Sequence, residues 1–197
     1  MAYILAINSG STSTKIALFE GEKEVFTKTL RHSSEEISQY ESVIDQLDFR
    51  EKTILAALDE SGINLKDIKV IVGRGGLLRP ISSGVYEVND AMLADLSSAC
   101  YGEHASNLGG ILAKKIADRT DGCRAFIADP VVVDELSDVA RVSGHPLFPK
   151  ISIFHALNHK AIAKLYARES GCDYADLNLI VAHLGGGVSV GAHSGGR

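Results

Sequence analysis

Residues 4–18 read ILAINSGSTSTKIAL, and this stretch decides the predicted fold. One apolar run, Ile4–Asn8, enters a turn of glycine and small hydroxyl residues, and a second run, Lys15–Leu18, leaves it. Short apolar runs bounded by turn residues are typical of strands, so we expect two strands joined by this turn. A third strand is predicted at residues 25–30, after the turn signal Gly21-Glu22, which gives a three-stranded meander.

Beyond the meander, strand and helix patterns alternate. Further strands are predicted at residues 68–72, 125–128, 179–182 and 188–192. Helices are predicted at residues 35–60, 90–100, 106–119 and 156–169. We expect Gly62 to end the first helix and Ser106 to cap the third. One face of the last helix is expected to carry Leu157, Ile162, Leu165 and Tyr166. This order predicts an α/β architecture with a mixed sheet and flanking helices.

The composition is that of a soluble globular protein, with 45% hydrophobic and 23% charged residues. A net charge of -5 without any Lys/Arg cluster argues against a nucleic-acid partner. The N-terminus has no secretory signal pattern and no apolar run approaches a membrane span, so we expect a cytoplasmic protein without a membrane partner. Three widely spaced cysteines without a C-x-x-C motif predict reduced thiols rather than disulfides or a zinc site.

The first turn, residues 8–15, is a candidate phosphate-binding loop. Gly10 lets the backbone come close to an anion, and several N–H groups and hydroxyls of the turn can converge on phosphate oxygens. The turn does not match G-x-x-x-x-G-K-[ST], and no helix follows it, so it is not a Walker A loop. An ordinary hairpin turn rich in serine and threonine is the alternative.

A second turn, residues 183–187, repeats this arrangement near the end of the chain. Gly185-Gly186-Gly187 places three residues without side chains in a row. Such a run is required where a ligand must come close to the backbone or where the dihedral angles are unusual. His183 at the strand tip can donate to a phosphoryl oxygen. The echo of the first turn is compatible with the opening of a related second domain. A plain terminal hairpin with a surface histidine stays an equal alternative on pattern alone.

Two charged residues end predicted strands. Arg74 stands among glycines, where a guanidinium can bind a carboxylate or phosphate in a bidentate manner, and a surface salt bridge is its alternative. Asp129 ends its strand before Pro130, at the sheet edge where ligands bind in open α/β sheets. An acid there can hold magnesium or orient an attacking oxygen, and a helix cap is its alternative.

Taken jointly, the motifs resemble the butyrate kinases, within the acetate and sugar kinase/Hsp70/actin superfamily, and the resemblance covers the whole chain in order. The matching segments are NSGSTSTK at 8–15, RGGLL at 74–78, GEHASN at 102–107, DPVVVDE at 129–135, ARVSGHP at 140–146, SIFHALN at 152–158 and AHLGGG at 182–187. The resemblance implies the actin-like ATPase (ribonuclease H-like) fold, built in the family as two such domains with the active site between them.

The resemblance also implies a division of the chain. Residues 1–177 would form the first actin-like domain, and residues 178–197 the opening hairpin of a truncated second one. Family members are nearly twice this long. We therefore expect this chain to be the N-terminal part, to lack the adenosine-binding segment and to be inactive alone.

For the site, the resemblance implies ATP/ADP and Mg²⁺ as cofactors. The residues expected to bind phosphate or nucleotide are Asn8, Ser9, Gly10, Ser11, Thr12, Ser13, Lys15, Gly185, Gly186 and Gly187. Arg74 would hold the carboxylate or the transferring phosphoryl group, and His183 would stabilise charge on that group in flight. Asp129 would position magnesium or the attacking oxygen, with Asn8 also near the metal. The acyl pocket would be bordered by His104 and Val131.

The implied reaction is the reversible transfer of a phosphoryl group from ATP to butyrate, giving butyryl phosphate. A close variant accepts acetate, propionate or branched-chain fatty acids, because one methylene is worth only about 1–3 kcal/mol of discrimination. A non-catalytic phosphate-binding or assembly fragment is the alternative from another class, and a sugar or glycerol kinase is disfavoured by the motifs. The expected partners are a nucleotide, a small carboxylate and further copies of the chain, in a homodimer or higher oligomer.

Overall fold

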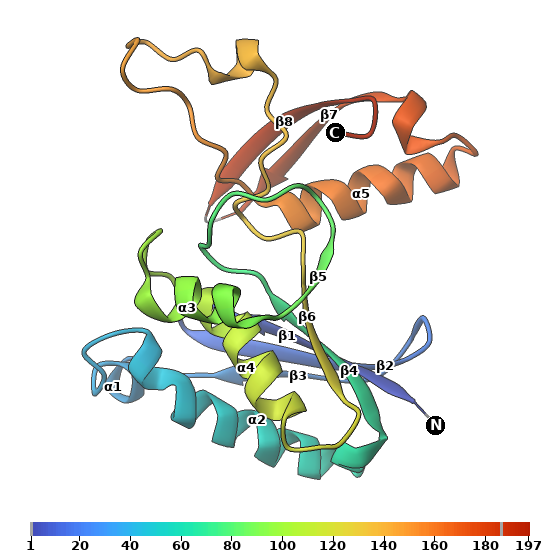
Figure 1. Cartoon of the computed structure of the whole chain (residues 1–197). Coiled ribbons are helices and arrows are strands. Elements are labelled where there is room, and N and C mark those ends of the chain that lie inside the picture. Colours follow the sequence, from blue (N-terminus) through green and yellow to red (C-terminus); the bar gives the residue numbers. More distant parts are fainter. Residues whose placement is uncertain (1, 186) are drawn as a thin grey trace. The chain divides into compact units, whose positions relative to one another are not determined.

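The computed structural model describes residues 2–185 and 187–197, and its largest element is a six-stranded mixed sheet (Figure 1). The strands are β1 (Tyr3–Ser9), β2 (Ser13–Glu20), β3 (Lys23–Arg31), β4 (Ile68–Arg74), β5 (Val85–Glu87) and β6 (Arg124–Ala128). Their order is β3-β2-β1-β4-β6-β5, in which β1, β4 and β6 are parallel and the other pairs antiparallel. The predicted meander and the mixed α/β sheet are confirmed.

Helices cover this sheet and close its core. They are α1 (Ser34–Ile37), α2 (Leu47–Ser61), α3 (Asp90–Ser98) and α4 (Asn107–Ala117). Helix α4 packs against β1, β4 and β6, while α2 contacts α4, β2 and β3. Leu5, Ile71 and Leu112 are fully buried, so the core lies where α4 meets the parallel strands. Gly62 ends α2 in the left-handed region, at φ 72°, as predicted.

Two sequence predictions for this region were wrong, and one strand was not predicted. The helix predicted at residues 35–60 is interrupted between α1 and a 3-10 turn, Ile44–Gln46, that leads into α2. The Asp45 carboxylate accepts hydrogen bonds from the Ser42 N–H and hydroxyl, and such local bonding competes with helix formation. Strand β5 was not predicted, because three residues are too few to show the alternation of apolar and polar side chains that is typical of a strand. Ser106 precedes α4 without capping it by its side chain.

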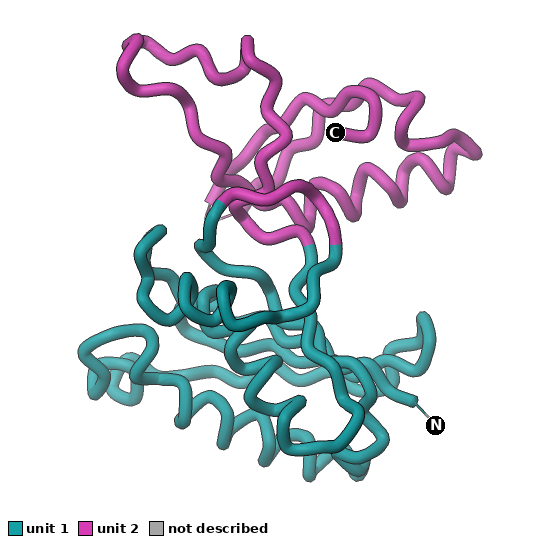
Figure 2. The backbone as a smooth tube through the Cα atoms, in the orientation of Figure 1, with its two compact units in different colours: residues 1–79, 85–128 teal, residues 80–84, 129–197 magenta. Residues whose placement is uncertain are grey.

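The chain divides into two compact units (Figure 2). The first comprises residues up to 79 and residues 85–128, and the second comprises residues 80–84 and 129–197. The second unit holds 3-10 turns at Asp138–Arg141 and Tyr174–Asp176, helix α5 (Ala156–Glu169), and an antiparallel sheet of β7 (Asn178–Leu184) and β8 (Val188–Ser194). The predicted domain boundary between residues 177 and 178 stays a prediction.

Helix α5 lies where it was predicted, but its buried face is not the apolar one. Leu157, Ile162, Leu165 and Tyr166 are all exposed. The buried positions are Ala156, His159, Lys160, Ala163 and Ala167. Small and hydrogen-bonded side chains thus occupy the interior of this unit, and a hydrophobic period cannot reveal them.

The β7–β8 hairpin has one covered and one open face. Its outer face carries three cross-strand apolar pairs, Ile180–Ala192, Ala182–Val190 and Leu184–Val188, and all six residues are exposed. Helix α5 packs on β7. No helix within the described residues is long and apolar enough to cross a membrane.

Candidate active site

The first group of predicted site residues lies at the carboxyl ends of β1 and β4. Ile7 is the register partner of Gly73, so the next residues, Asn8 and Arg74, leave the sheet side by side. The Arg74 guanidinium donates to Asn8 Oδ1 over 3.4 Å. Lys15 is the register partner of Asn8, and directly opposed residues of antiparallel strands share a face. The fold therefore gathers these three polar side chains at one edge of the sheet.

The turn between β1 and β2 is closed by backbone hydrogen bonds. The Gly10 N–H donates to Ser13 O over 2.8 Å, and the His32 N–H donates to Thr12 O over 2.9 Å. Ser11 and Thr12 form the exposed tip. These bonds give the predicted phosphate loop a defined shape.

Arg50, on α2, was not predicted and holds this turn from inside the unit. Its side chain is fully buried. The guanidinium donates to Gly10 O (2.9 Å), Ser11 O (3.2 Å), Ser13 O (3.3 Å), Thr14 Oγ1 (3.0 Å) and Gln46 Oε1 (2.8 Å). Arginines within helices are usually exposed to solvent, so no signal in the sequence identifies Arg50 as a buried residue that holds the turn.

The glycines around Arg74 serve backbone packing. A Cβ on Gly73 would lie 2.0 Å from Gly109 O, and a Cβ on Gly109 would lie 2.2 Å from Arg74 O. Helix α4 therefore touches β4 backbone to backbone, which only glycines allow. Burial lowers the pKa of the Arg74 guanidinium, which still stays charged at neutral pH.

His104 is held in one tautomer by the start of α4. The Ser106 N–H donates to His104 Nδ1 over 3.1 Å, and the Ser106 hydroxyl lies 2.8 Å from the same nitrogen. A backbone N–H can only donate, so the neutral ring carries its proton on Nε2. Desolvation, and then the positive charge of Arg74, lower the pKa of His104. A neutral ring with one N–H donor suits a carboxylate ligand.

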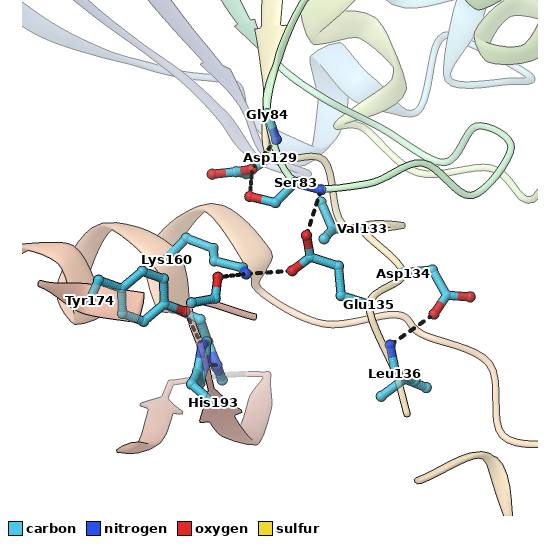
Figure 3. A network of polar contacts seen from close by, with 12 residues as sticks. Ser83, Gly84, Asp129, Val133, Asp134, Glu135, Leu136, Lys160, Tyr174 and His193 are labelled. Carbon is cyan, nitrogen blue, oxygen red and sulfur yellow. Dashed lines mark hydrogen bonds and ion pairs between the residues drawn. The ribbon is translucent and has the colours of Figure 1, made fainter. Parts of the chain in front are cut away.

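In the second unit, Asp129 lies in the left-handed region, at φ 37°. Its Oδ1 accepts hydrogen bonds from the Ser83 hydroxyl at 2.7 Å and the Gly84 N–H at 2.8 Å (Figure 3). No helix follows Asp129, because the Val133 N–H closes a turn onto Pro130 O, so the alternative role as a helix cap is wrong. For Oδ2 of Asp129, no hydrogen bond joins it to another described residue.

A buried ion pair stands next to Asp129 in the same network (Figure 3). Lys160 pairs with Glu135 Oε2 and donates to Gly196 O over 3.2 Å. The Lys160 side chain is only 2% exposed. Glu135 Oε1 accepts from the Ser83 N–H over 3.2 Å, so Ser83 links the ion pair to Asp129.

His183 lies at the end of β7. Its ring is held by Asn158 of α5 and by His155, which directly precedes that helix. The Asn158 amide donates to His183 Nδ1 over 2.8 Å. The His155 ring stacks on the His183 ring, with centroids 3.8 Å apart and planes 6° apart. A Cβ on Gly187 would lie 3.2 Å from His155 Cε1, so the glycine leaves room for that ring.

Behind His155, a row of polar side chains continues into the interior. The Tyr174 hydroxyl lies 2.6 Å from His193 Nδ1 (Figure 3). His193 Nε2 lies 3.4 Å from His159 Nδ1. Ser189 Oγ lies 2.9 Å from both His159 Nε2 and His155 Nδ1. Donors and acceptors match throughout when each ring is neutral with its proton on Nε2.

The electrostatics of this row agree with neutral rings. Desolvation is the main cause that lowers the pKa values of His159 and His193. Burial, and then the negative charges of Glu135 and Asp129, raise the pKa of Tyr174, which therefore stays a donor. Sequence reasoning missed this row because no motif joins its members.

The contacts of the remaining predicted residues give no further support for a role in ligand binding. Ser9 is fully buried, and its hydroxyl has no hydrogen-bond partner within the described residues. Val131 is half-buried and accepts from the Phe154 N–H over 3.1 Å. Gly185 is exposed, and Gly186 lies outside the described residues.

The donor set of the predicted metal residues suits magnesium. A carboxylate oxygen of Asp129 and the amide oxygen of Asn8 are hard oxygen ligands, which Mg²⁺ prefers. No group of three or more His, Cys, Asp or Glu within residues 2–185 and 187–197 is arranged to hold a metal ion. Magnesium bound through one carboxylate and substrate phosphates needs no such group.

Solved structures identify the fold. An acetate kinase of Porphyromonas gingivalis superposes with a TM-score of 0.72 at 18% identity, over 100% of this chain and 56% of that one. A propionate kinase of Francisella tularensis gives a TM-score of 0.65 at 18% identity, over 100% of this chain and 56% of that one. The chain therefore has the actin-like ATPase fold of the acetate kinases, as predicted.

Curated proteins narrow the resemblance further. The chain is 59% identical over 194 residues to butyrate kinase 2 of Clostridium acetobutylicum, covering 98% of this chain and 54% of that protein. It is 56% identical over 197 residues to butyrate kinase 1 of the same organism, covering 55% of that protein. The predicted resemblance to butyrate kinases is thus confirmed, and the chain spans about half the length of these relatives. No protein-family profile matches the chain.

Proposed function

We propose that the chain is part of a short-chain carboxylate kinase that transfers the γ-phosphoryl group of ATP to butyrate. The observation that carries this proposal is the 59% identity to a butyrate kinase over 98% of the chain. The polar edge of Asn8, Lys15 and Arg74 supports it, because such a cluster suits binding of phosphate and carboxylate.

Each site residue has a role that its contacts support. The Arg74 guanidinium binds the carboxylate or the phosphoryl group, and the exposed N–H groups of the first turn bind phosphate oxygens. His183 donates from Nε2 to an oxygen of the phosphoryl group, because Asn158 occupies its Nδ1. Asp129 orients the attacking oxygen or magnesium with the carboxylate oxygen that its Ser83 and Gly84 contacts leave.

The chemistry demands little of a general base. A carboxylate substrate is already a nucleophile, so positioning and charge neutralisation supply most of the rate enhancement. Mg²⁺, when bound, would neutralise phosphate charge, and the Asp129 carboxylate and the Asn8 amide each offer an oxygen of the kind that it prefers. The cytoplasmic location and the homodimer or higher oligomer stay part of this proposal, as does the preference for butyrate over acetate, propionate or branched acids.

The test measures butyrate-dependent release of ADP from ATP. It uses the 197-residue chain and a chimaera in which the remaining length of butyrate kinase 2 of Clostridium acetobutylicum follows it. We expect activity in the chimaera and little in the shorter chain. Arg74→Ala and His183→Ala in the chimaera should each lower turnover severely, and near-normal turnover would remove that residue from the mechanism. A chimaera that folds but stays inactive would refute the kinase proposal.

A second candidate function is a non-catalytic assembly fragment. The open apolar face of the β7–β8 hairpin favours it, because Ile180 is 81% exposed and Val190 63% exposed. Sedimentation of the 197-residue chain tests it. A monomer at all concentrations would exclude assembly through this face.

A further inference from the structure

Arg50 lies beneath the turn that the proposed function assigns to phosphate binding. Its fully buried guanidinium donates to the carbonyls of Gly10, Ser11 and Ser13, and the His32 N–H occupies the carbonyl of Thr12. Every carbonyl from residue 10 to residue 13 is therefore engaged by a donor of the same unit. Unengaged carbonyls would present negative ends of dipoles to an approaching anion.

The N–H groups of the same turn behave in the opposite way. Gly10 donates within the turn, to Ser13 O. For the N–H groups of Ser11 and Thr12, the described residues provide no acceptor, and both residues are exposed. Successive free N–H groups in a turn form a concave site for anions. The carbonyls of the turn are thus hydrogen-bonded within the unit, whereas the free N–H donors lie at its exposed tip.

The charge of Arg50 is not cancelled nearby. No carboxylate of the described residues forms an ion pair with it, and its side-chain partner at both Nε and Nη2 is the neutral Gln46. A buried cation without a counter-ion is costly. Its field also acts in a region of low dielectric, where it extends further than in water. An anion bound at the turn would supply the missing counter-charge.

We propose that Arg50 is a positioning residue of the phosphate-binding turn. It draws the carbonyls of Gly10, Ser11 and Ser13 inward and supplies uncancelled positive charge beneath the turn. The inference rests on the proposed function, because it assumes that the turn binds phosphate. Arg50 touches no substrate and acts through the turn.

Two variants of the 197-residue chain separate geometry from charge. Arg50→Lys keeps the positive charge but replaces a fork of donors by a single ammonium group. Gln46→Glu keeps both acceptor contacts to Arg50 and cancels its charge. Lys52→Met, which removes an exposed cation from the same helix, is the control. Pyrophosphate is the probe, titrated with magnesium and followed by the amide NMR shifts of residues 10–13.

The NMR experiment also measures hydrogen exchange of the Gly10 amide, which needs no ligand. We expect Arg50→Lys to raise both the exchange rate and the pyrophosphate Kd about tenfold or more, as for the loss of one or two charge-assisted hydrogen bonds. Gln46→Glu should leave the exchange rate unchanged and raise Kd severalfold. Lys52→Met should change neither quantity.

The outcomes are distinguishable. Native exchange and native Kd in Arg50→Lys would overturn the proposal, and a native Kd in Gln46→Glu would overturn its charge component. If Arg50→Lys does not fold, Gln46→Ala replaces it, because the loss of Gln46 releases Nε and Nη2, and unchanged Gly10 exchange there counts against the proposal. If the wild-type chain binds no pyrophosphate, phosphate binding by the turn fails, while Gly10 exchange still decides whether Arg50 holds it.

Discussion

The side-chain amide of Asn158 lies 2.8 Å from Nδ1 of His183, and this contact selects the histidine tautomer. An amide NH₂ can only donate, so Nδ1 is the acceptor and Nε2 carries the proton. The neighbouring His155 ring, stacked at 3.8 Å, limits rotation of the His183 ring. Asn158, the last residue of the matching segment at 152–158, thus controls which nitrogen of His183 faces a ligand as a donor.

Replacing Asn158 by Asp reverses this preference. A carboxylate accepts from Nδ1–H, so we expect Asn158→Asp to move the proton from Nε2 to Nδ1. The imidazole ¹⁵N shifts of the 197-residue chain report this change. In the chimaera, turnover should fall about 10–100-fold, as for other supporting hydrogen bonds of a reactive histidine. Asn64→Asp, at the start of a 3-10 turn, makes the same charge change elsewhere and should leave His183 unaltered.

The buried pair of Lys160 and Glu135 should respond strongly to the loss of one partner. Lys160→Met leaves the Glu135 carboxylate without its cation, and we expect a loss of about 3–5 kcal/mol in the free energy of unfolding. The double variant Lys160→Met/Glu135→Gln should recover part of this loss, because no uncompensated charge remains. Urea denaturation measures all three free energies. Equal stability of the single variant and the wild type would show that the pair is solvated.

The glycine contact between β4 and α4 should tolerate no side chain. We expect Gly73→Ala and Gly109→Ala to cost about 1–3 kcal/mol or more each, because the new methyl would meet backbone atoms at 2.0 and 2.2 Å. Gly144→Ala is the control, since a Cβ there meets nothing within 4 Å, and it should be neutral or slightly stabilising. Thermal unfolding of the three variants checks this. A native melting temperature for Gly109→Ala would contradict the close contact.

Acid should destabilise the chain through its buried histidines. Desolvation is the main cause that lowers the pKa values of His32, His159 and His193 below their ordinary 6.5. The unfolded chain therefore binds more protons than the folded chain just below that pH, and the free energy of unfolding falls as pH falls through this window. Urea denaturation at about pH 7.5 and about pH 5 measures the drop.

One variant assigns part of this drop. His32→Gln should reduce the difference between the two pH values, because glutamine does not titrate there. His145→Gln, which changes an exposed histidine, is the control. The paired carboxylate of Asp134, whose pKa is lowered mainly by its hydrogen bond to Arg141, loses its contribution only at lower pH. A stability that rises on acidification from pH 7.5 would contradict the neutral, buried state of these rings.

The sequence predicted the features that follow from local pattern. The β1–β2–β3 meander and Gly62 were predicted because apolar period and turn residues determine them within a few positions. The butyrate kinase resemblance placed Asn8 and Arg74 in one site, and the parallel register of β1 and β4 does bring them together. The roles of His183 and Asp129 stay predictions.

The supporting residues could not be predicted in the same way. Arg50, Lys160 and Asn158 act through hydrogen bonds to groups far along the chain, and such bonds leave no hydrophobic period. The break after α1 depends on a local bond of Asp45 that competes with helix propensity. Burial of His159 instead of Leu157 on α5 depends on partners supplied by β8.

The contacts of Arg50 also constrain the order in which the chain can fold. Its acceptors in the first turn lie 36 to 40 positions earlier in the chain. Hairpins close within microseconds, whereas contacts at larger sequence separation must first overcome loop-closure entropy. The β1–β2 hairpin can therefore form before its turn has its final shape. The turn reaches that shape only when α2 has docked on the sheet, so a newly synthesised chain acquires its phosphate loop with the core rather than with the hairpin.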